Sequence, residues 1–257
     1  MSIVEHLTEL RKVLIVSLVA ILLGSFVSFF LWGDFLLGFL TAPLEDYNVP
    51  LVYISMTEAF LTKVKISVVA GVVLVSPVVF WQVWSFIVPA LHPNEKRIII
   101  TLFPISLILF VSGVLFAFFV VFKFVTNFLL LVAGEGLEAM ISVSRYVSFL
   151  LTFLLPFGFM FQLPLVVLFL TRLGFLTTAS LVKNRKYVVF ASFVIGAVLT
   201  PPDVISQVFM AGTLILLYEG SILVSRLVKP KVIDYEDDLV SQEAAAESFV
   251  QPSQKSE

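Results

Sequence analysis

VLIVSLVAILLGSFVSFFLW, residues 13–32, contains no charged side chain over twenty positions. A helix of about 20 apolar residues spans the roughly 30 Å hydrocarbon core of a bilayer. The stretch is too long for the hydrophobic part of an ordinary cleavable signal peptide, and no small-residue cleavage site follows it. It therefore predicts a first transmembrane helix, over residues 13–33, that stays in the protein.

Five further apolar stretches predict a membrane protein with six spans in total. They cover residues 61–84, 98–122, 147–170, 187–200 and 204–225. A double proline cannot continue a helix, so Thr200-Pro201-Pro202-Asp203 marks a tight turn between the last two. The fifth is short, rising only about 21 Å at 1.5 Å per residue. The predicted fold class is all-α: a polytopic membrane protein whose last two helices are short.

The composition excludes several classes of protein. Hydrophobic residues make up 60% of the chain and charged residues 13%, about half the share typical of soluble domains. There are no cysteines and only two histidines, so disulfides and thiolate or histidine-rich metal sites are not expected. Phosphate loops, nucleophile elbows and nucleic-acid motifs are absent from the sequence. We therefore expect neither an enzyme, nor a cofactor, nor a nucleic-acid partner.

The distribution of Lys and Arg predicts that both termini lie in the cytoplasm. Residues 1–12, 85–97, 171–186 and 226–257 hold 12 of the 16 basic residues, and such residues concentrate in cytoplasmic loops. The opposite segments, 34–60 and 124–146, are half apolar and are interpreted as interfacial caps on the outer surface. No organellar transit peptide is evident, which favours a bacterial or archaeal origin.

Two domains are predicted from the change in composition near the C-terminus. Residues 1–230 form the six-span membrane domain. The remainder, residues 231–257, is interpreted as a disordered cytoplasmic tail, because residues 232–257 hold seven acidic residues against one base, Lys255, and lack an apolar period.

The N-terminal segment Ser2–Lys12 predicts the start of the first helix. Ser2 and Glu5 fit a capping box. Glu5 and Glu9 then share one face and repel slightly. Two interpretations of these acids remain open: a solvated helix start, or an acidic receptor for a basic ligand at the cytoplasmic surface.

The segment Trp84–Arg97 connects the second and third spans and offers a similar choice. Pro93 suits the first turn of the next helix, and Glu95 then lies near its positive end. Alternatively, Glu95 is an acid that faces the cytoplasm beside an exposed apolar side chain, Phe86.

Few polar residues lie within the predicted spans. Gln162 is near the middle of the fourth span and Glu219 lies in the sixth, while Thr200, Asp203 and Gln207 surround the outer turn. Because intramembrane polar groups are costly, they are usually paired or functional. Gln162 is either functional or a hydrogen bonder that stabilises the bundle, and Asp203 is expected to cap the last helix.

Taken together, these segments resemble the TatC family, the multispanning receptor subunit of the twin-arginine protein translocase. The resemblance runs from about residue 3 to 228 and is carried by His6–Lys12, Ala42-Pro43-Leu44, Trp84–Leu91, Glu95-Lys96-Arg97, Phe161–Pro164 and Leu199–Gln207. It implies transport of folded proteins that bear a signal peptide with paired arginines, driven by the proton-motive force. It also implies TatA and TatB as single-span partners, in homo- and hetero-oligomers within the lipid bilayer.

The resemblance also implies roles for individual residues. Glu9 and Glu95 would receive the two arginines, Phe86 would contact neighbouring signal-peptide residues, and Arg11 would belong to the same surface. The residues that would help to dock a partner's span are Thr200, Asp203 and Gln207. Pro43 would hold the outer cap in shape.

Gln162 departs from the family pattern, which commonly has a glutamate at this position. Glutamine keeps the capacity for hydrogen bonds but cannot titrate, so a role that needs ionisation does not carry over.

Two other functions remain alternatives. One is a secondary transporter of a small solute, suggested by Gln162 and the prolines of the fourth span, and the other is a structural membrane scaffold.

Overall fold

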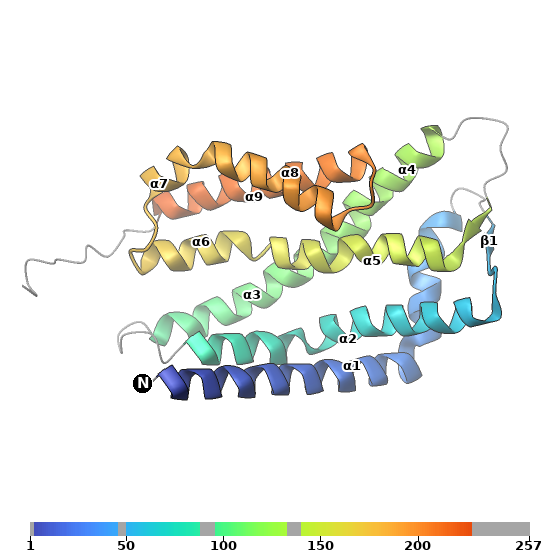
Figure 1. The fold of residues 1–257 in the computed structure, drawn as a ribbon, viewed down its shortest axis with the longest axis horizontal. Coiled ribbons are helices and arrows are strands. Elements are labelled where there is room, and N and C mark those ends of the chain that lie inside the picture. Colours follow the sequence, from blue (N-terminus) through green and yellow to red (C-terminus); the bar gives the residue numbers. More distant parts are fainter. Residues whose placement is uncertain (1–2, 46–49, 88–95, 133–139, 228–257) are drawn as a thin grey trace, which may run out of the picture.

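A computed structural model describes residues 3–45, 50–87, 96–132 and 140–227 of the chain. Nearly all of these residues are helical (Figure 1). The α-helices are α1 (Ile3–Glu45), α2 (Met56–Ile87), α3 (Lys96–Phe116), α4 (Lys123–Val132), α5 (Val143–Met160), α6 (Leu163–Arg172), α7 (Thr178–Lys183), α8 (Arg185–Leu199) and α9 (Val204–Leu227). A π-helix, η2 (Ala117–Phe122), joins α3 to α4 without a break. The strands β1 (Leu51–Val52) and β2 (Ile141–Ser142) contribute two residues each.

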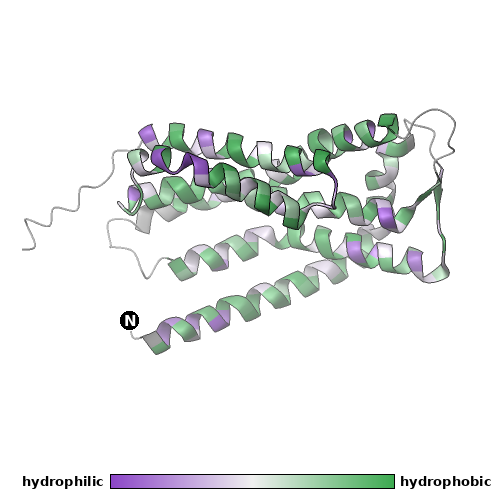
Figure 2. Cartoon of the chain, turned by 45° about the horizontal axis from the view of Figure 1, so that its top comes forward, coloured by the Kyte–Doolittle hydropathy of each residue, from purple (hydrophilic) through white to green (hydrophobic). Residues whose placement is uncertain are grey.

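Five stretches of the described chain are long and apolar enough to cross a membrane. They are Val4–Leu44, Met56–Ile87, Ile100–Val132, Val143–Arg172 and Val204–Arg226. Figure 2 shows hydrophobic residues along the helices and hydrophilic residues gathered mainly towards the two ends of the bundle. The predicted fifth span is present as α8, but its 15 residues fall short of this length. Six crossings therefore stay a prediction.

Two helices extend well beyond the predicted spans. The first continues from residue 33 to Glu45, and the third continues through η2 to Val132. Figure 1 shows that the last part of α1 turns away from the first part and crosses one end of the bundle. Leu40 and Leu44 are buried there, and the Tyr146 hydroxyl donates to the Leu40 carbonyl at 3.0 Å. Tertiary packing, which hydropathy does not report, sustains this extra helix.

A short parallel strand pair connects the starts of α2 and α5. Leu51 pairs with Ile141, and Val52 pairs with Ser142. This pairing and the contacts of Glu58 together form what we call the strand joint. The sequence pattern did not predict it, because the partners are separated by about ninety residues.

Glu58 holds the strand joint together through both of its carboxylate oxygens. Oε2 accepts the backbone N–H groups of Ile54 at 2.6 Å and Ser55 at 3.3 Å. Oε1 accepts the Ser142 hydroxyl and, at 3.1 Å, the Ser144 N–H. One side chain thus caps the start of α2 and ties it to the start of α5.

The core surrounds α5, which contacts α2, α3 and η2. Its largest fully buried side chains include Phe110, Phe122, Phe153 and Phe157. The Phe122 ring lies 5.3 Å from the Tyr146 ring and 6.4 Å from the Phe153 ring. Such aromatic packing orders the interior where α5 crosses its neighbours.

The two ends of the bundle carry different segments (Figure 1). The start of α1, the end of α2, the start of α3, the end of α6 and the end of α9 lie at what we call the N-terminal end. The strand joint, the turned part of α1 and the end of α4 lie at the opposite end, the strand end. The tip of the α8–α9 hairpin stops short of the strand end. The segments that hold most of the Lys and Arg residues are thus joined to helix ends at the N-terminal end of the bundle.

Candidate functional site

The N-terminal end of α1 presents a half-buried acid, Glu9. Its Oε2 atom is buried and has no hydrogen-bond partner within the described part of the chain. Val4, Glu5, Thr8 and Lys12 line a surface hollow of about 420 Å³ together with it. A buried acceptor without a donor carries a desolvation cost, so this hollow is suited to a ligand that donates hydrogen bonds.

An aromatic contact fixes the first turns of α1 against the end of α2. The rings of His6 and Phe86 are stacked, with centroids 4.4 Å apart and planes 21° apart. His6 lies one helical turn before Glu9, so the stack places Phe86 near the acidic hollow. The sequence assigned no role to His6, although its place beside the acids was visible.

Of the other two residues predicted for this site, the structure describes Arg11 but not Glu95. Arg11 is exposed on α1, at the same end of the molecule. Glu95 lies outside the described residues, directly before the first residue of α3, Lys96. The structure thus brings Glu9, Arg11 and Phe86 to one end of the bundle.

Gln162 connects three helical segments near the middle of the bundle. It lies in the two-residue break between α5 and α6, and its Nε2 donates to the Ser106 carbonyl of α3 at 3.0 Å. The Ser106 hydroxyl donates to the Phe103 carbonyl at 2.6 Å. It also accepts the Trp84 indole N–H of α2 at 3.3 Å. These contacts favour the interpretation that Gln162 stabilises the bundle.

The polar residues of the α8–α9 turn bind within their own hairpin. Thr200 Oγ1 donates to the Gly196 carbonyl at 2.9 Å, and Gln207 Nε2 donates to the Phe193 carbonyl at 3.1 Å. Asp203 Oδ1 accepts the Ser206 N–H at 2.7 Å, which is the predicted cap of the last helix. Their role in docking a partner stays a prediction.

Pro43 lies near the end of α1, beside the buried Leu44. It has no N–H to donate to the carbonyl four residues earlier, which weakens the helix locally. Its position is the turned part of α1 that crosses the strand end. The segment predicted as an outer cap around Pro43 is therefore the end of a helix, and the role of Pro43 in shaping it stays a prediction.

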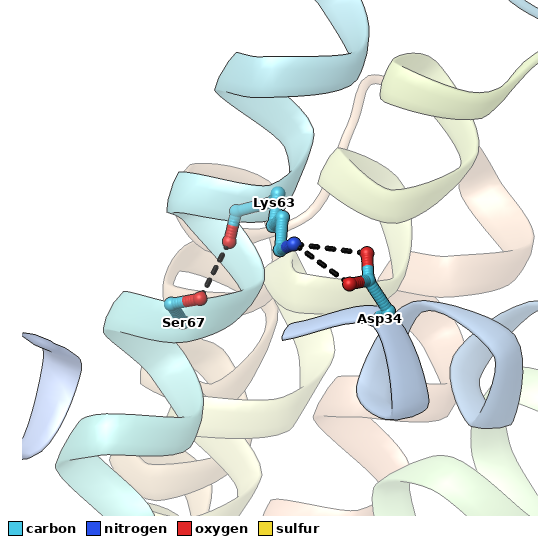
Figure 3. Close-up of polar contacts among 3 residues, drawn as sticks. All are labelled: Asp34, Lys63 and Ser67. Carbon is cyan, nitrogen blue, oxygen red and sulfur yellow. Dashed lines mark hydrogen bonds and ion pairs between the residues drawn. The ribbon is translucent and has the colours of Figure 1, made fainter. Parts of the chain in front are cut away.

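Two ion pairs join neighbouring helices and were not predicted. Figure 3 shows Lys63 of α2 reaching Asp34 of α1, with Nζ at 2.9 Å and 3.0 Å from the carboxylate oxygens. Arg185 of α8 binds Glu219 of α9 at 2.6 Å. The sequence did contain a signal for such pairs, because charged residues near or inside a membrane are usually paired.

The described residues contain no group of three His, Asp or Glu side chains that could hold a metal ion.

Comparison with known proteins identifies the family. The family model for TatC, described as Sec-independent protein translocase protein, matches residues 5–212. The chain belongs to the TatC family. The TatC protein of Carboxydothermus hydrogenoformans is 46% identical over 232 residues, which cover 90% of this chain and 95% of that protein. TatCy of Bacillus subtilis is 36% identical, covering 88% of this chain and 89% of that protein.

A solved structure of a TatC protein has the same fold. It is a crystal structure described as the twin-arginine translocase receptor TatC. It superposes with a TM-score of 0.78 at 40% sequence identity, covering 86% of this chain and 98% of the other. The match confirms the resemblance that the sequence motifs indicated, and TatC membership makes the chain a protein translocase component in a membrane.

The contact of Gln162 predicts how substitutions there change stability. Gln162→Leu loses one interhelical hydrogen bond, which contributes about 0.6 kcal/mol on average inside membranes, so a small fall in the unfolding temperature is expected. Gln162→Glu should lose stability as the pH rises, because an ionised carboxylate cannot donate to the Ser106 carbonyl. Thermal unfolding of the detergent-solubilised variants at low and high pH measures both effects. A pH-independent Gln162→Glu protein would contradict this assignment.

Proposed function

We propose that this chain is the receptor that binds twin-arginine signal peptides for export of folded proteins. In this proposal it lies in a bacterial inner membrane, with the N-terminal end of the bundle in the cytoplasm. It crosses the membrane six times, with α8 as the short fifth span. It acts with TatA-type and TatB-type partners, and the proton-motive force drives transport. Residues 1–230 form the membrane domain and residues 231–257 a cytoplasmic tail.

The observation that carries the proposal is the buried Oε2 of Glu9, to which no described residue donates a hydrogen bond, beside the His6–Phe86 stack. Arginine is always charged and presents a planar fork of donors that matches a carboxylate. Hydrogen bonds between such charged groups are about twice as strong as neutral ones. Glu9 would accept one arginine and Glu95 the other, while Phe86 would contact the apolar part of the peptide. Binding should weaken with added salt.

Two further observations support the orientation. The predicted cytoplasmic segments hold most of the Lys and Arg, and the helix ends that adjoin them lie together in Figure 1. The candidate peptide site lies at this same end. A newly folded substrate in the cytoplasm would therefore meet Glu9 and Phe86 directly.

The short length of α8 is an argument that a partner's helix packs against it. Its 15 residues rise only about 22 Å, against roughly 30 Å of hydrocarbon. Phe190, Val194 and Val198 repeat every four residues along it and are exposed. An apolar span of TatA or TatB type would cover this face and relieve the mismatch. The turn residues Thr200, Asp203 and Gln207 would then border the partner.

The proposal predicts that Glu9→Gln combined with Glu95→Gln strongly weakens binding of a signal peptide with paired arginines. Because each exposed charge pair contributes about 0–1 kcal/mol and a partly buried one more, we expect at least about a tenfold loss of affinity. Binding of a fluorescent peptide to the purified full chain measures this loss. The matched control is Asp34→Asn, which removes a carboxylate at the opposite end.

A peptide with paired lysines provides a second control, because lysine lacks the planar fork. The receptor should bind it more weakly than the arginine peptide. Equal binding of the arginine peptide by the double variant and the original chain would refute the receptor proposal.

Export of a twin-arginine reporter in cells lacking the protein separates a receptor from a structural scaffold. Export should be lost if the protein is the receptor and should continue if it is only a scaffold. A transporter is not favoured, because Nε2 of Gln162 already donates to the Ser106 carbonyl of α3.

A further inference from the structure

A basic recess lies between α2, α5 and the tip of the α8–α9 hairpin. It has a volume of about 410 Å³ and is lined by Lys65 of α2, by Ser144, Arg145, Ser148 and Thr152 of α5, and by Pro201 of the turn. We propose that this recess binds the phosphate of a phospholipid headgroup. The proposal needs only a protein embedded in a bilayer and does not rest on signal-peptide binding.

Both cations of the recess are available for an anion. Lys65 Nζ donates to the Ser148 hydroxyl at 3.0 Å and forms no ion pair within the described residues. Arg145 is exposed and likewise has no ion pair with any residue that the structure describes. Its guanidinium can bind phosphate with two parallel hydrogen bonds, and the lysine adds a point charge. Two cations and a hydroxyl thus converge on one hollow.

The described carboxylates around the recess are already engaged. Glu58 contacts Ser144 through the backbone N–H, but its two oxygens accept four hydrogen bonds in total. Asp34 binds Lys63, and Asp203 caps α9. The acids within 45–49 and 133–139 have no described side chains. Within the described region, an anion from outside the chain is therefore the natural partner for Lys65 and Arg145.

The hairpin explains why that anion would be a lipid phosphate. The turn that contains Pro201 and Asp203 exposes polar backbone and a charge, which cannot remain in hydrocarbon. The polar headgroup region must therefore reach down to the turn, where α8 is too short to span the core. Because Pro201 lines the recess, the headgroups arrive at the level of Lys65 and Arg145. Phe149 also lines the recess and offers an apolar surface to the adjoining acyl chain.

The proposal is tested with the purified full chain in mild detergent, titrated with phosphatidylglycerol. Native mass spectrometry counts the lipid molecules retained by each variant. Lys65→Gln combined with Arg145→Gln should weaken retention about tenfold, since two charge-assisted contacts are removed. The matched control, Lys63→Gln with Lys123→Gln, removes two positive charges that do not line the recess. It changes the net charge by the same amount and should retain the lipid normally. Equal retention by the recess variant and the original chain would overturn the proposal.

Two further titrations of the original chain keep the test decisive if the double variant does not fold. Diacylglycerol, which lacks the phosphate, should be retained about tenfold less well than phosphatidylglycerol. Inorganic phosphate at the same concentration should compete poorly, because it lacks the acyl chains held beside Phe149. A chain that binds both lipids equally has no phosphate site here. Equally tight binding of inorganic phosphate would identify a soluble anion instead, and would overturn the lipid assignment.

Discussion

Gly71→Val is expected to force α1 and α2 apart and to destabilise the protein strongly. A Cβ atom at Gly71 would lie only 2.6 Å from the Cα atom of Ser25, so a side chain there meets the backbone of the other helix. A Cβ at Gly24 would likewise approach the Gly71 carbonyl oxygen at 3.0 Å. Small residues let transmembrane helices approach closely. Overpacking commonly costs about 1–3 kcal/mol. Here the clash is with backbone atoms of Ser25, which cannot move aside as a flexible side chain could.

If the proposed function holds, the variant should also lose signal-peptide binding. Glu9 and His6 lie on α1 and Phe86 on α2, so separating these helices breaks the His6–Phe86 stack. Thermal unfolding and the fluorescent-peptide assay measure the two effects on the same detergent-solubilised sample. Gly38→Val on α1 is the matched control, because nothing lies within 4 Å of a Cβ at that position. If Gly71→Val unfolds at the same temperature as Gly38→Val, the close crossing of α1 and α2 is wrong.

The sequence predicted the helices well where hydropathy determines them. The last helix was expected at residues 204–225 and is Val204–Leu227, and the preceding one was expected at 187–200 and is Arg185–Leu199. The helix extensions were missed, because Leu40 and Leu44 are held by tertiary packing rather than by lipid. A hydropathy argument locates the part of a helix inside the bilayer and is blind to the part outside it.

Part of the candidate site could be predicted from the sequence. Residue chemistry left two interpretations of the acids near the start of α1 open, and only the resemblance to the TatC family named Glu9 as a receptor for arginine. The stacking of His6 on Phe86 could not be predicted, because it depends on how α1 and α2 pack side by side. The same limit applies to Gln162, whose partner Ser106 is 56 residues away. Pairings between distant segments follow from tertiary structure, which local patterns do not encode.

Glu58→Gln is expected to open the strand joint, because a carboxamide cannot replace two acceptor oxygens. One amide atom would be an oxygen and the other an NH₂ group. In either orientation the NH₂ would face groups that now donate to Glu58. These are the N–H groups of Ile54 and Ser55 on one side, and the Ser142 hydroxyl with the Ser144 N–H on the other. Glu58→Ala removes both acceptors and should be at least as harmful. We expect a clear fall in the unfolding temperature for both variants.

Limited proteolysis adds a local measurement to thermal unfolding, since cleavage should increase near β1 and β2 before the bundle unfolds. Asp34→Asn is the matched control, because Asp34 is a strongly exposed acid near the same end, with a side chain 88% accessible, and contributes one surface ion pair. It should unfold close to the temperature of the original chain. If Glu58→Gln behaved like Asp34→Asn, the four hydrogen bonds of Glu58 would not be what joins α2 to α5. The joint would then depend on the β1–β2 pairing and on the burial of Tyr146 beneath α1.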